Sequence, residues 1–338
     1  MSETANAPTT TRNLRVGLIG LGSMGRHHAR VIRATPGMEL VAVADPGGDR
    51  FGVAGELELL PDVAALIDVG LDAAMVAVPT VYHEEVALAL AEAGVPTMVE
   101  KPIAHSVQAG RRVADAFASR DLVGAVGYVE RCNPALRALR ERLDAGELGQ
   151  VYQVLTRRQG PFPARISDVG VVKDLATHDV DLTAWVAGSP YCSISAQVTH
   201  RSGRANEDMV VANGLLANGV IVSHTVNWLT PFKERVTIVT GEKGAFVADT
   251  LTGDLTFHAN GTVASTWDQV AAFRGVSEGD VIRYAIPKRE PLALEQEHFR
   301  DAVLGTGSEA VTMADGVATL IVVEAILASA SENRVVEI

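Results

Sequence analysis

The chain has 338 residues and a formal net charge of −12, from 29 basic and 41 acidic side chains. This charge disfavours nucleic-acid binding, because a basic surface supplies most of the affinity in proteins that bind phosphate backbones. The length is too great for one hydrophobic core to organise, so two domains are expected. The only cysteines, Cys132 and Cys192, are too few for a disulfide framework, and a reducing cytoplasm is the expected compartment.

The first residues of the chain do not have the features of a targeting segment. Residues 1–13 lack a basic stretch followed by an apolar one, so they predict a short flexible tail rather than a secretory signal. No uninterrupted apolar run reaches the roughly 18 residues that span a bilayer. We therefore expect a soluble protein with no membrane partner.

Between residues 14 and 128, short apolar runs alternate with helical stretches. The pattern predicts βαβ units and a parallel sheet covered on both faces, and hence an α/β fold that begins with a Rossmann dinucleotide-binding domain. The expected strands are Leu14–Gly20, Leu40–Ala44, Ala73–Val78, Thr97–Glu100 and Leu122–Gly127, and the expected helices are Met24–Ala34, Tyr82–Ala93 and Ser106–Ser119.

Residues 129–338 have a different pattern, which predicts an α+β domain with a large, open, mostly antiparallel sheet. Helices are expected at Pro134–Ala145 and within Ile166–Ala187, and Asn218-Gly219 is a typical hairpin turn between the strands that follow. The expected strands are Tyr191–His200, Met209–Ala217, Val220–Trp228, Arg235–Thr240, Ala245–Asp249 and Leu255–His258, followed by helices Leu294–Leu304 and Met313–Ser331 and a short strand Val335–Ile338.

A glycine-rich segment, Gly20-Leu21-Gly22-Ser23-Met24-Gly25, lies between the first strand and the first helix. In a turn of this form, the first glycine permits the tight turn and the second lets the backbone approach a pyrophosphate. The third glycine allows close packing of helix on strand, and the helix N-terminus supplies N–H donors. The segment therefore predicts a dinucleotide-binding loop.

Asp45 follows the second strand, 20 residues after Gly25. A carboxylate at this place accepts hydrogen bonds from the ribose hydroxyls of the adenosine and repels a 2′-phosphate, so NAD is favoured over NADP. Arg50 is close enough in the chain to leave NADP open. The alternative for Asp45 is a simple turn residue before Pro46.

Lys101 stands in Glu100-Lys101-Pro102, directly after an apolar strand. Ligands of parallel sheets bind at the carboxyl ends of the strands, so Lys101 is expected to point toward a substrate. Pro102 restricts the preceding residue to an extended conformation. The alternative is a solvated surface pair of Glu100 and Lys101.

Asp174 and His178 are four residues apart on an expected helix, so their side chains would share one face, which Asp181 would extend. A carboxylate beside an imidazole orients the ring and raises its basicity, which suits proton transfer. The alternative is a polar outer face with an incidental histidine.

Together with Pro79-Thr80-x-x-His83, these motifs resemble those of the Gfo/Idh/MocA oxidoreductases, and the likeness covers essentially the whole chain. The resemblance implies that Lys101, Asp174 and His178 are catalytic. It also implies a homodimer or homotetramer formed through the sheet of residues 129–338, which would then serve substrate binding and oligomerisation. The residues it assigns to NAD are Gly20, Gly22, Ser23, Met24, Asp45, Pro79, Thr80, His83, Glu100 and Lys101.

Segments 126–134, 157–163 and 168–174 further resemble a branch of that family that contains UDP-N-acetylglucosamine 3-dehydrogenases, and the aminoglycoside 3″-dehydrogenases are also similar. Cys132 stands where that branch usually has Phe, and Tyr128 where His is common, so the substrate stays open. The acidic composition weakly favours a cationic aminoglycoside. The expected substrate contacts are Lys101, Tyr128, Asn133, Arg165, Asp174 and His178.

The expected reaction oxidises a secondary ring hydroxyl to a ketone, at C3 of a hexose unit, as preparation for transamination. His178, held by Asp174, would take the hydroxyl proton while Lys101 binds the oxygen, and a neutral Lys101 acting as the base is the alternative. No H-E-x-x-H motif or cysteine cluster indicates a metal. UDP-N-acetylglucosamine 3-dehydrogenase, myo-inositol 2-dehydrogenase and a non-catalytic NAD-binding sensor are the other functions considered.

Overall fold

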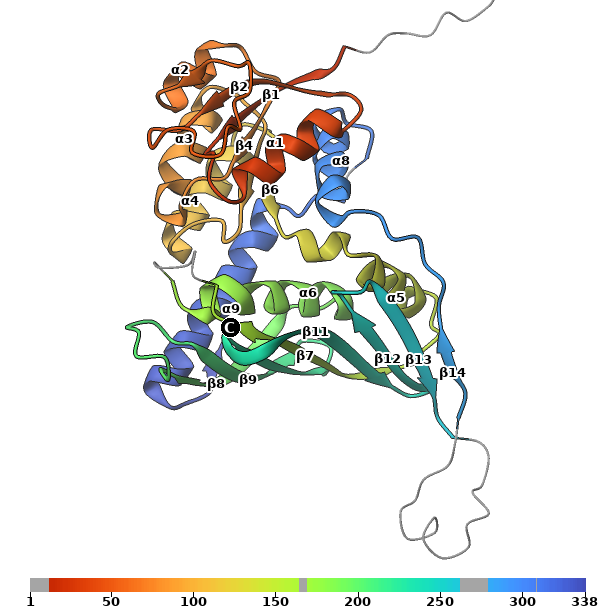
Figure 1. The fold of residues 1–338 in the computed structure, drawn as a ribbon. Coiled ribbons are helices and arrows are strands. Elements are labelled where there is room, and N and C mark those ends of the chain that lie inside the picture. The colour runs from red at the N-terminus through yellow and green to blue at the C-terminus, as the bar shows by residue number, and fades with distance from the viewer. Residues whose placement is uncertain (1–11, 164–168, 262–278, 308) are drawn as a thin grey trace, which may run out of the picture. The chain divides into compact units, whose positions relative to one another are not determined.

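The structure is a computed structural model that describes residues 12–163, 169–261, 279–307 and 309–338 (Figure 1). Contacts within the chain divide it into unit 1, residues 1–100, 112–127 and 292–312, and unit 2, residues 101–111, 128–291 and 313–338. The expected division at residue 128 took each domain as one continuous segment. It therefore differs from these units at residues 101–111, which belong to unit 2, and at residues 292–312, which belong to unit 1. The latter segment groups with unit 1 because Phe299 packs in its core. Residues 1–11 of the expected tail lie outside the described residues.

Unit 1 is built on a six-stranded parallel sheet with the strand order β3-β2-β1-β4-β5-β6, as in doubly wound dinucleotide-binding folds. Strands β4 and β5 are buried at every position, which explains the uninterrupted apolar sequence of β4 and the apolar centre of β5. The short β3 and α2 were not expected from the sequence. The strands are β1 (Leu14–Ile19), β2 (Met38–Ala44), β3 (Leu59–Leu60), β4 (Ala73–Val76), β5 (Thr97–Glu100) and β6 (Gly124–Gly127), and the helices between them are α1 (Gly25–Ala34), α2 (Val63–Asp68), α3 (His83–Glu92) and α4 (Val107–Ala118).

The core of unit 1 lies between its sheet and α1. Leu18 of β1, Ile32 of α1 and Met75 of β4 are fully buried in one cluster. Helix α8 (Pro291–Val303) adds Phe299 to the same cluster, so a segment far along the chain completes this core. Burying such side chains contributes about 1.5–3 kcal/mol each, which fixes the sheet edge from which the loops emerge.

Unit 2 is built on a nine-stranded sheet with the strand order β14-β13-β12-β11-β7-β10-β9-β8-β15. Neighbouring strands are antiparallel except β7 and β10, so the expectation of a mostly antiparallel sheet is confirmed. The strands are β7 (Val151–Pro161), β8 (Tyr191–Thr199), β9 (Met209–Leu216), β10 (Ile221–Asn227), β11 (Leu229–Gly241), β12 (Gly244–Asp249), β13 (Asp254–Ala259), β14 (Val281–Arg283) and β15 (Val336–Glu337).

Strand β7 is the central element that the sequence pattern did not predict. It pairs with β10 on one side and β11 on the other. Its residues alternate between a buried and a more exposed face, with Val154, Thr156 and Arg158 buried. The buried arginine interrupts the apolar alternation by which a strand is recognised in a sequence. It can be buried because tertiary contacts compensate its charge, and a short window of sequence does not contain those contacts.

One face of this sheet is covered by helices α5 (Pro134–Asp144), α6 (Thr177–Ala187) and α9 (Met313–Glu332), as Figure 1 shows. Helix α9 is long and apolar enough to cross a bilayer by composition alone. However, 56% of its most apolar window is buried inside the protein, and the helix packs on β8. Glu324 also accepts a hydrogen bond from the backbone N–H of Val107, at 3.0 Å. These contacts are those of a core helix in a globular protein.

Candidate functional site

The glycine-rich loop between β1 and α1 has the geometry that a pyrophosphate requires. Gly20 has a φ of +92°, and a Cβ there would lie 2.5 Å from the carbonyl carbon of Ala77. A Cβ on Gly25 would overlap the carbonyl oxygen of Gly20. By contrast, apart from the two neighbours of Gly22 in the chain, no heavy atom of the described residues lies within 4 Å of a Cβ built on it, so the second glycine faces open space there. The residues present therefore fit a dinucleotide, with the following turn at Ser23 and Met24 leading into α1.

Asp45 lies at the end of β2 and ties its loop to the glycine-rich loop. Its Oδ2 accepts a hydrogen bond from the N–H of Leu21, and its Oδ1 accepts one from the N–H of Gly47, both at 2.7 Å. Each carboxylate oxygen has a second lone pair, so Asp45 can still accept hydrogen bonds from ribose hydroxyls. Its place beside the loop supports the expected role.

The segment after β4 contains three residues expected to bind the cofactor. Pro79 is exposed and precedes a 3₁₀ turn that begins at Thr80. His83 is the first residue of α3 and is only 1% exposed, with Nε2 3.0 Å from the backbone oxygen of Val78. This contact fixes the β4–α3 connection, so His83 shapes the loop through the chain's own backbone.

Glu100, at the end of β5, is engaged inside unit 1. Its Oε1 lies 2.7 Å from Nε2 of His28, whose Nδ1 lies 3.0 Å from Nε2 of Gln296. Because the amide nitrogen of Gln296 can only donate, the proton of a neutral His28 ring belongs on Nε2 and points to Glu100. This buried chain fixes the residue that precedes Lys101, and sequence reasoning had left His28 out of the site.

The contrast between Gly22 and Gly25 gives a matched test of the dinucleotide loop. Gly22→Val should leave the fold intact, because its side chain enters open space, but should weaken NAD binding by at least about 10-fold by filling the place of the pyrophosphate. Gly25→Val should instead lower the free energy of unfolding by about 1–3 kcal/mol, because its Cβ overlaps backbone. Calorimetric NAD titration and thermal unfolding separate the two effects. Unchanged NAD affinity in Gly22→Val would contradict this placement.

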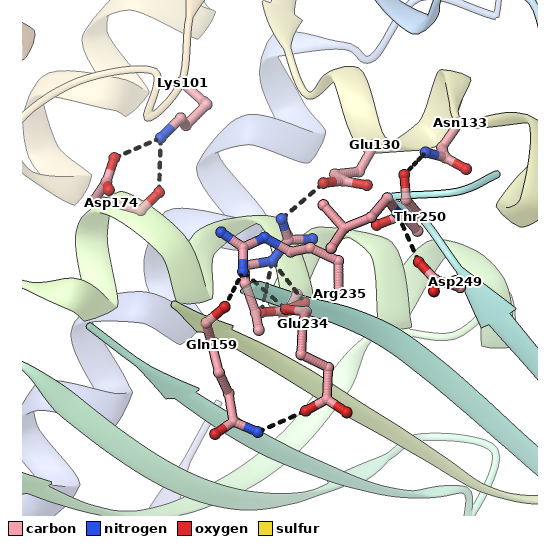
Figure 2. Close-up of polar contacts among 12 residues, drawn as sticks. Lys101, Glu130, Asn133, Gln159, Asp174, Glu234, Arg235, Asp249 and Thr250 are labelled. Atoms are coloured by element: carbon pink, nitrogen blue, oxygen red, sulfur yellow. Dashed lines mark hydrogen bonds and ion pairs between the residues drawn. The ribbon is translucent and has the colours of Figure 1, made fainter. Parts of the chain in front are cut away.

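Lys101 and Asp174 form a hydrogen-bonded ion pair in unit 2 (Figure 2). Nζ of Lys101 donates to the backbone oxygen of Asp174 at 2.7 Å and to its Oδ1 at 3.2 Å. The side chains are 16% and 6% exposed, so the pair is largely withdrawn from water and its charges are only weakly screened. The two contacts to one residue fix the direction of the Lys101 side chain.

The prediction that Asp174 holds the ring of His178 is wrong. Asp174 lies in a π-helical turn, Val172–Ala176, that precedes α6, and its carboxylate points to Lys101. The Oδ2 of Asp174 and the Nδ1 of His178 are both buried, and neither has a hydrogen-bond partner in the part of the chain that the structure describes. Residues four apart share one face in an ordinary α-helix, but the chain is wound more widely in this π-helical turn, so that spacing no longer brings the two side chains together.

His178 is a neutral ring with one accessible nitrogen. Its Nδ1 is buried without a hydrogen-bond partner among the described residues. The residue as a whole is partly exposed, so Nε2 is the ring nitrogen left to receive a proton. The ring of Tyr128 packs edge-on against it, with centroids 6.3 Å apart. Burial holds the pKa of His178 well below its ordinary value. The positive charges of Lys101, Arg158 and Arg235 lower that pKa further.

A buried ion cluster beside His178 was missed by sequence reasoning. Arg158 of β7 contacts both carboxylate oxygens of Asp179 at 3.0 and 3.1 Å, and Oε1 of Glu130 at 2.7 Å. Burial raises the pKa of Asp179 to about 6, against the opposing effect of Arg158. The cluster joins α6 to the sheet and so orients the helix that carries His178. An acidic residue directly after His178 was the only sequence signal for it.

The remaining expected substrate contacts either bond within the chain or lie outside the described residues. Tyr128 is 1% exposed, and its hydroxyl lies 3.0 Å from Oγ1 of Thr177. Asn133 caps α5 by accepting from the N–H of Ala135, and it donates to the backbone oxygen of Thr250, so both ends of its amide are engaged. These residues support the fold around the site rather than present free groups to a ligand. Arg165 lies outside the described residues.

Asp181 was expected to extend the polar stripe of Asp174 and His178. It instead forms a buried pair with Arg131, whose Nε and Nη2 donate to its two oxygens at 2.9 and 2.6 Å. Burial raises the pKa of Asp181, and the guanidinium of Arg131 opposes that rise. Among the described residues, no three His, Cys, Asp or Glu side chains gather in a way that could hold a metal ion.

Comparison with known proteins identifies the family. The model of the oxidoreductase family with an NAD-binding Rossmann fold, GFO_IDH_MocA, matches residues 14–128, and that of the GFO/IDH/MocA C-terminal domain matches residues 136–247. UDP-N-acetylglucosamine 3-dehydrogenase of Acidithiobacillus ferrooxidans is 32% identical over 96% of this chain and 97% of its own. Inositol 2-dehydrogenase 2 of Saccharopolyspora erythraea is 33% identical, but the match spans only 62% of this chain and 65% of that enzyme.

Solved structures agree with this assignment. The structure of the Acidithiobacillus ferrooxidans enzyme, GnnA, has a TM-score of 0.84 at 26% identity and covers 95% of this chain and 98% of its own. GenD2 from gentamicin A biosynthesis, solved in complex with NAD, has a TM-score of 0.80 at 25% identity and covers 100% and 99%. The chain therefore belongs to the Gfo/Idh/MocA family of oxidoreductases, and its Rossmann domain binds NAD.

Proposed function

We propose that this protein oxidises a secondary ring hydroxyl of a sugar, at C3 of a hexose unit, to a ketone that a later transamination converts to an amine. The observation that carries the proposal is the accessible Nε2 of a neutral His178 in the same unit as a Lys101 held by Asp174. A ring nitrogen that can accept a proton and a cation that can bind an oxygen are the two groups that alcohol oxidation needs.

In this mechanism the residues of unit 2 handle the hydroxyl group. Lys101 binds its oxygen and stabilises the negative charge that develops there. Nε2 of His178 accepts the proton, which requires the neutral ring to carry its own proton on Nδ1. Asp174 fixes Lys101 through two hydrogen bonds. NAD, held by the glycine-rich loop and Asp45, supplies the hydride acceptor.

The proposal that the oxidised carbon is C3 rests on the relatives as well as on this site. GnnA is named as a UDP-N-acetylglucosamine 3-dehydrogenase, and GenD2 comes from gentamicin A biosynthesis. Both matches extend over nearly the whole chain, whereas the sequence match to inositol 2-dehydrogenase 2 of Saccharopolyspora erythraea spans 62% of it, and a putative myo-inositol dehydrogenase that covers 96% is only 24% identical. A 3-keto amino-sugar precursor is therefore favoured over an inositol as the product class.

The purified protein should be tested with NAD and NADP against UDP-N-acetylglucosamine, an aminoglycoside with a free 3″-hydroxyl and myo-inositol. Nicotinamide absorbance and product mass should reveal a ketone lighter than its substrate by two hydrogen atoms. A coupled aminotransferase should be included, because ketone formation can be uphill. Tight NAD binding without turnover of any ring alcohol would reject the proposal in favour of a sensor.

The oligomeric state is part of the same proposal: a soluble cytoplasmic homodimer or homotetramer formed through the open face of the unit 2 sheet. On the face away from α5, α6 and α9, Val211, Leu215 and Ile221 are 39%, 43% and 52% exposed. Apolar side chains grouped on neighbouring strands are typical of an interface between subunits. Ile221→Glu should shift the mass measured by light scattering toward the monomer. An unchanged mass in this variant would argue for a different interface.

A further inference from the structure

Arg235 is a charged side chain that the proposed mechanism does not use. It lies on β11 directly opposite Arg158 of β7, and residues paired in this register point to the same face of the sheet. Arg158 contacts Asp179 of α6, so this is the face on which His178 lies. Figure 2 shows Arg235 in one view with Lys101.

The two opposed arginines have different partners. Arg158 binds the carboxylates of Glu130 and Asp179. Arg235 donates through Nη1 to two backbone oxygens at 2.7 and 2.8 Å, and within the described residues it forms no ion pair. Its Nε and Nη2 make no hydrogen bond within the described residues either, and the side chain is only partly buried.

This arrangement sets two guanidinium groups opposite each other, and within the described residues no carboxylate forms an ion pair with Arg235. Like charges directly across a strand pair destabilise a sheet. Burial and the neighbouring Arg158 lower the pKa of Arg235, whereas the charges of Asp179, Glu130 and Asp174 oppose that shift without a hydrogen bond to it. The planar fork of donors on a guanidinium matches the two oxygens of a carboxylate or phosphate. A half-buried fork beside His178 is therefore placed to receive an oxyanion.

We propose that Arg235 binds an anionic group of the substrate, so that the enzyme selects ring alcohols that carry a carboxylate or phosphate. This deepens the proposed function and rests on it, because the anion is to hold the ring whose hydroxyl reacts. The attraction of Arg235 for an anion should outweigh the repulsion from the overall charge of −12. A direct contact in a partly buried site is screened by salt far less than distant surface charges are. An anionic substrate is thus favoured over a polycationic aminoglycoside.

Binding to the complex of the full chain with NADH tests the proposal without requiring turnover. Calorimetry would compare UDP-N-acetylglucosamine with the neutral methyl N-acetylglucosaminide, and methyl glucuronide with methyl glucoside. The first pair tests a phosphate source of the anion and the second a carboxylate source. At least one anionic probe should bind more tightly than its neutral partner. Arg235→Met should weaken that probe by about 100-fold and change the neutral one little.

Two variants serve as controls. Arg235→Lys keeps the charge but not the fork and should lose part of the affinity. Arg157→Met removes the neighbouring arginine of β7, which points to the other face, is 45% exposed and pairs with Glu234, and it should bind all probes normally. Thermal unfolding of each variant verifies its fold.

The outcomes separate this inference from the proposed function. Selective anion binding without ketone formation would support Arg235 while rejecting the oxidation. Ketone formation with no preference for either anionic probe would overturn the role of Arg235, as would equal weakening of charged and neutral probes in Arg235→Met. The latter result would instead make Arg235 a structural counter-charge for Glu130 and Asp179.

Discussion

Replacing Lys101 with methionine should lower kcat for ring-alcohol oxidation by about 1,000-fold. Methionine is close in length to the lysine stem but has no charge or N–H to stabilise oxygen as it loses its proton. Removing one such donor at a developing oxyanion costs about 100- to 1,000-fold in other enzymes. Lys101 is also the cation that pairs with the buried Asp174, so the variant leaves that carboxylate uncompensated. Stopped-flow measurement of NADH formation checks the rate.

Two other variants distinguish chemistry from structure in this prediction. Lys173→Met removes the adjacent lysine, whose Nζ donates to the backbone oxygen of His105, and should keep normal turnover. Asp174→Asn keeps the backbone oxygen that accepts from Lys101, and its amide oxygen can still accept as well, so the variant should lose only about 10-fold, through loss of the carboxylate charge. Near-normal turnover of Lys101→Met would remove Lys101 from the mechanism.

Much of the nucleotide half could be predicted because its chemistry is local. Gly20, Gly22 and Gly25 each meet a different steric requirement of one turn, and six consecutive residues form that turn. Asp45 needs only the end of the next strand to reach the same loop. Short apolar strands that are buried on both faces likewise give an unambiguous pattern. The parallel sheet and its cofactor loop therefore followed from the sequence.

The geometry around His178 could not be predicted because its contacts join distant segments. Arg158 is buried on β7 only because Glu130 and Asp179 neutralise it, and none of these three identifies the others in the sequence. The partner of Asp174 was misjudged because a π-helical turn replaces the assumed α-helix. Residue types in a pattern indicated a proton-transfer site, but which side chains touch depended on local winding and tertiary packing.

Replacing His178 with asparagine should lower kcat by about 100- to 10,000-fold, the range found when a positioned general base is removed. The amide preserves polarity near the buried Nδ1 position but cannot accept the proton. Tyr128, which packs edge-on against the ring, should tolerate replacement by phenylalanine far better. Steady-state rates in both directions, with NAD binding as the control, measure the effect. If His178→Asn kept near-normal turnover, neutral Lys101 would become the base.

The pH dependence of activity gives an independent check on the same residue. Because the pKa of His178 lies well below 6.5, its ring stays neutral at pH 7 and the acid limb of kcat/KM should fall well below pH 6.5. Arg235→Met removes one of the positive charges that lower this pKa, so the limb should move to higher pH. An acid limb near pH 6.5 that Arg235→Met leaves in place would contradict the lowered pKa of His178.

The same shift of pKa links His178 to stability, with a definite sign. Above about pH 6.5 the ring is neutral in both the folded and unfolded states. Below it, the unfolded chain takes a proton that the folded protein refuses, so the free energy of unfolding falls as pH falls. Wild type should therefore lose stability relative to His178→Asn by up to about 1.4 kcal/mol per pH unit on acidification. His224, whose pKa burial lowers to about 4, is present in both proteins and cancels from this difference. A constant difference between the two proteins from pH 7.5 to 5 would mean that His178 titrates normally, and the neutral base of the mechanism would be lost.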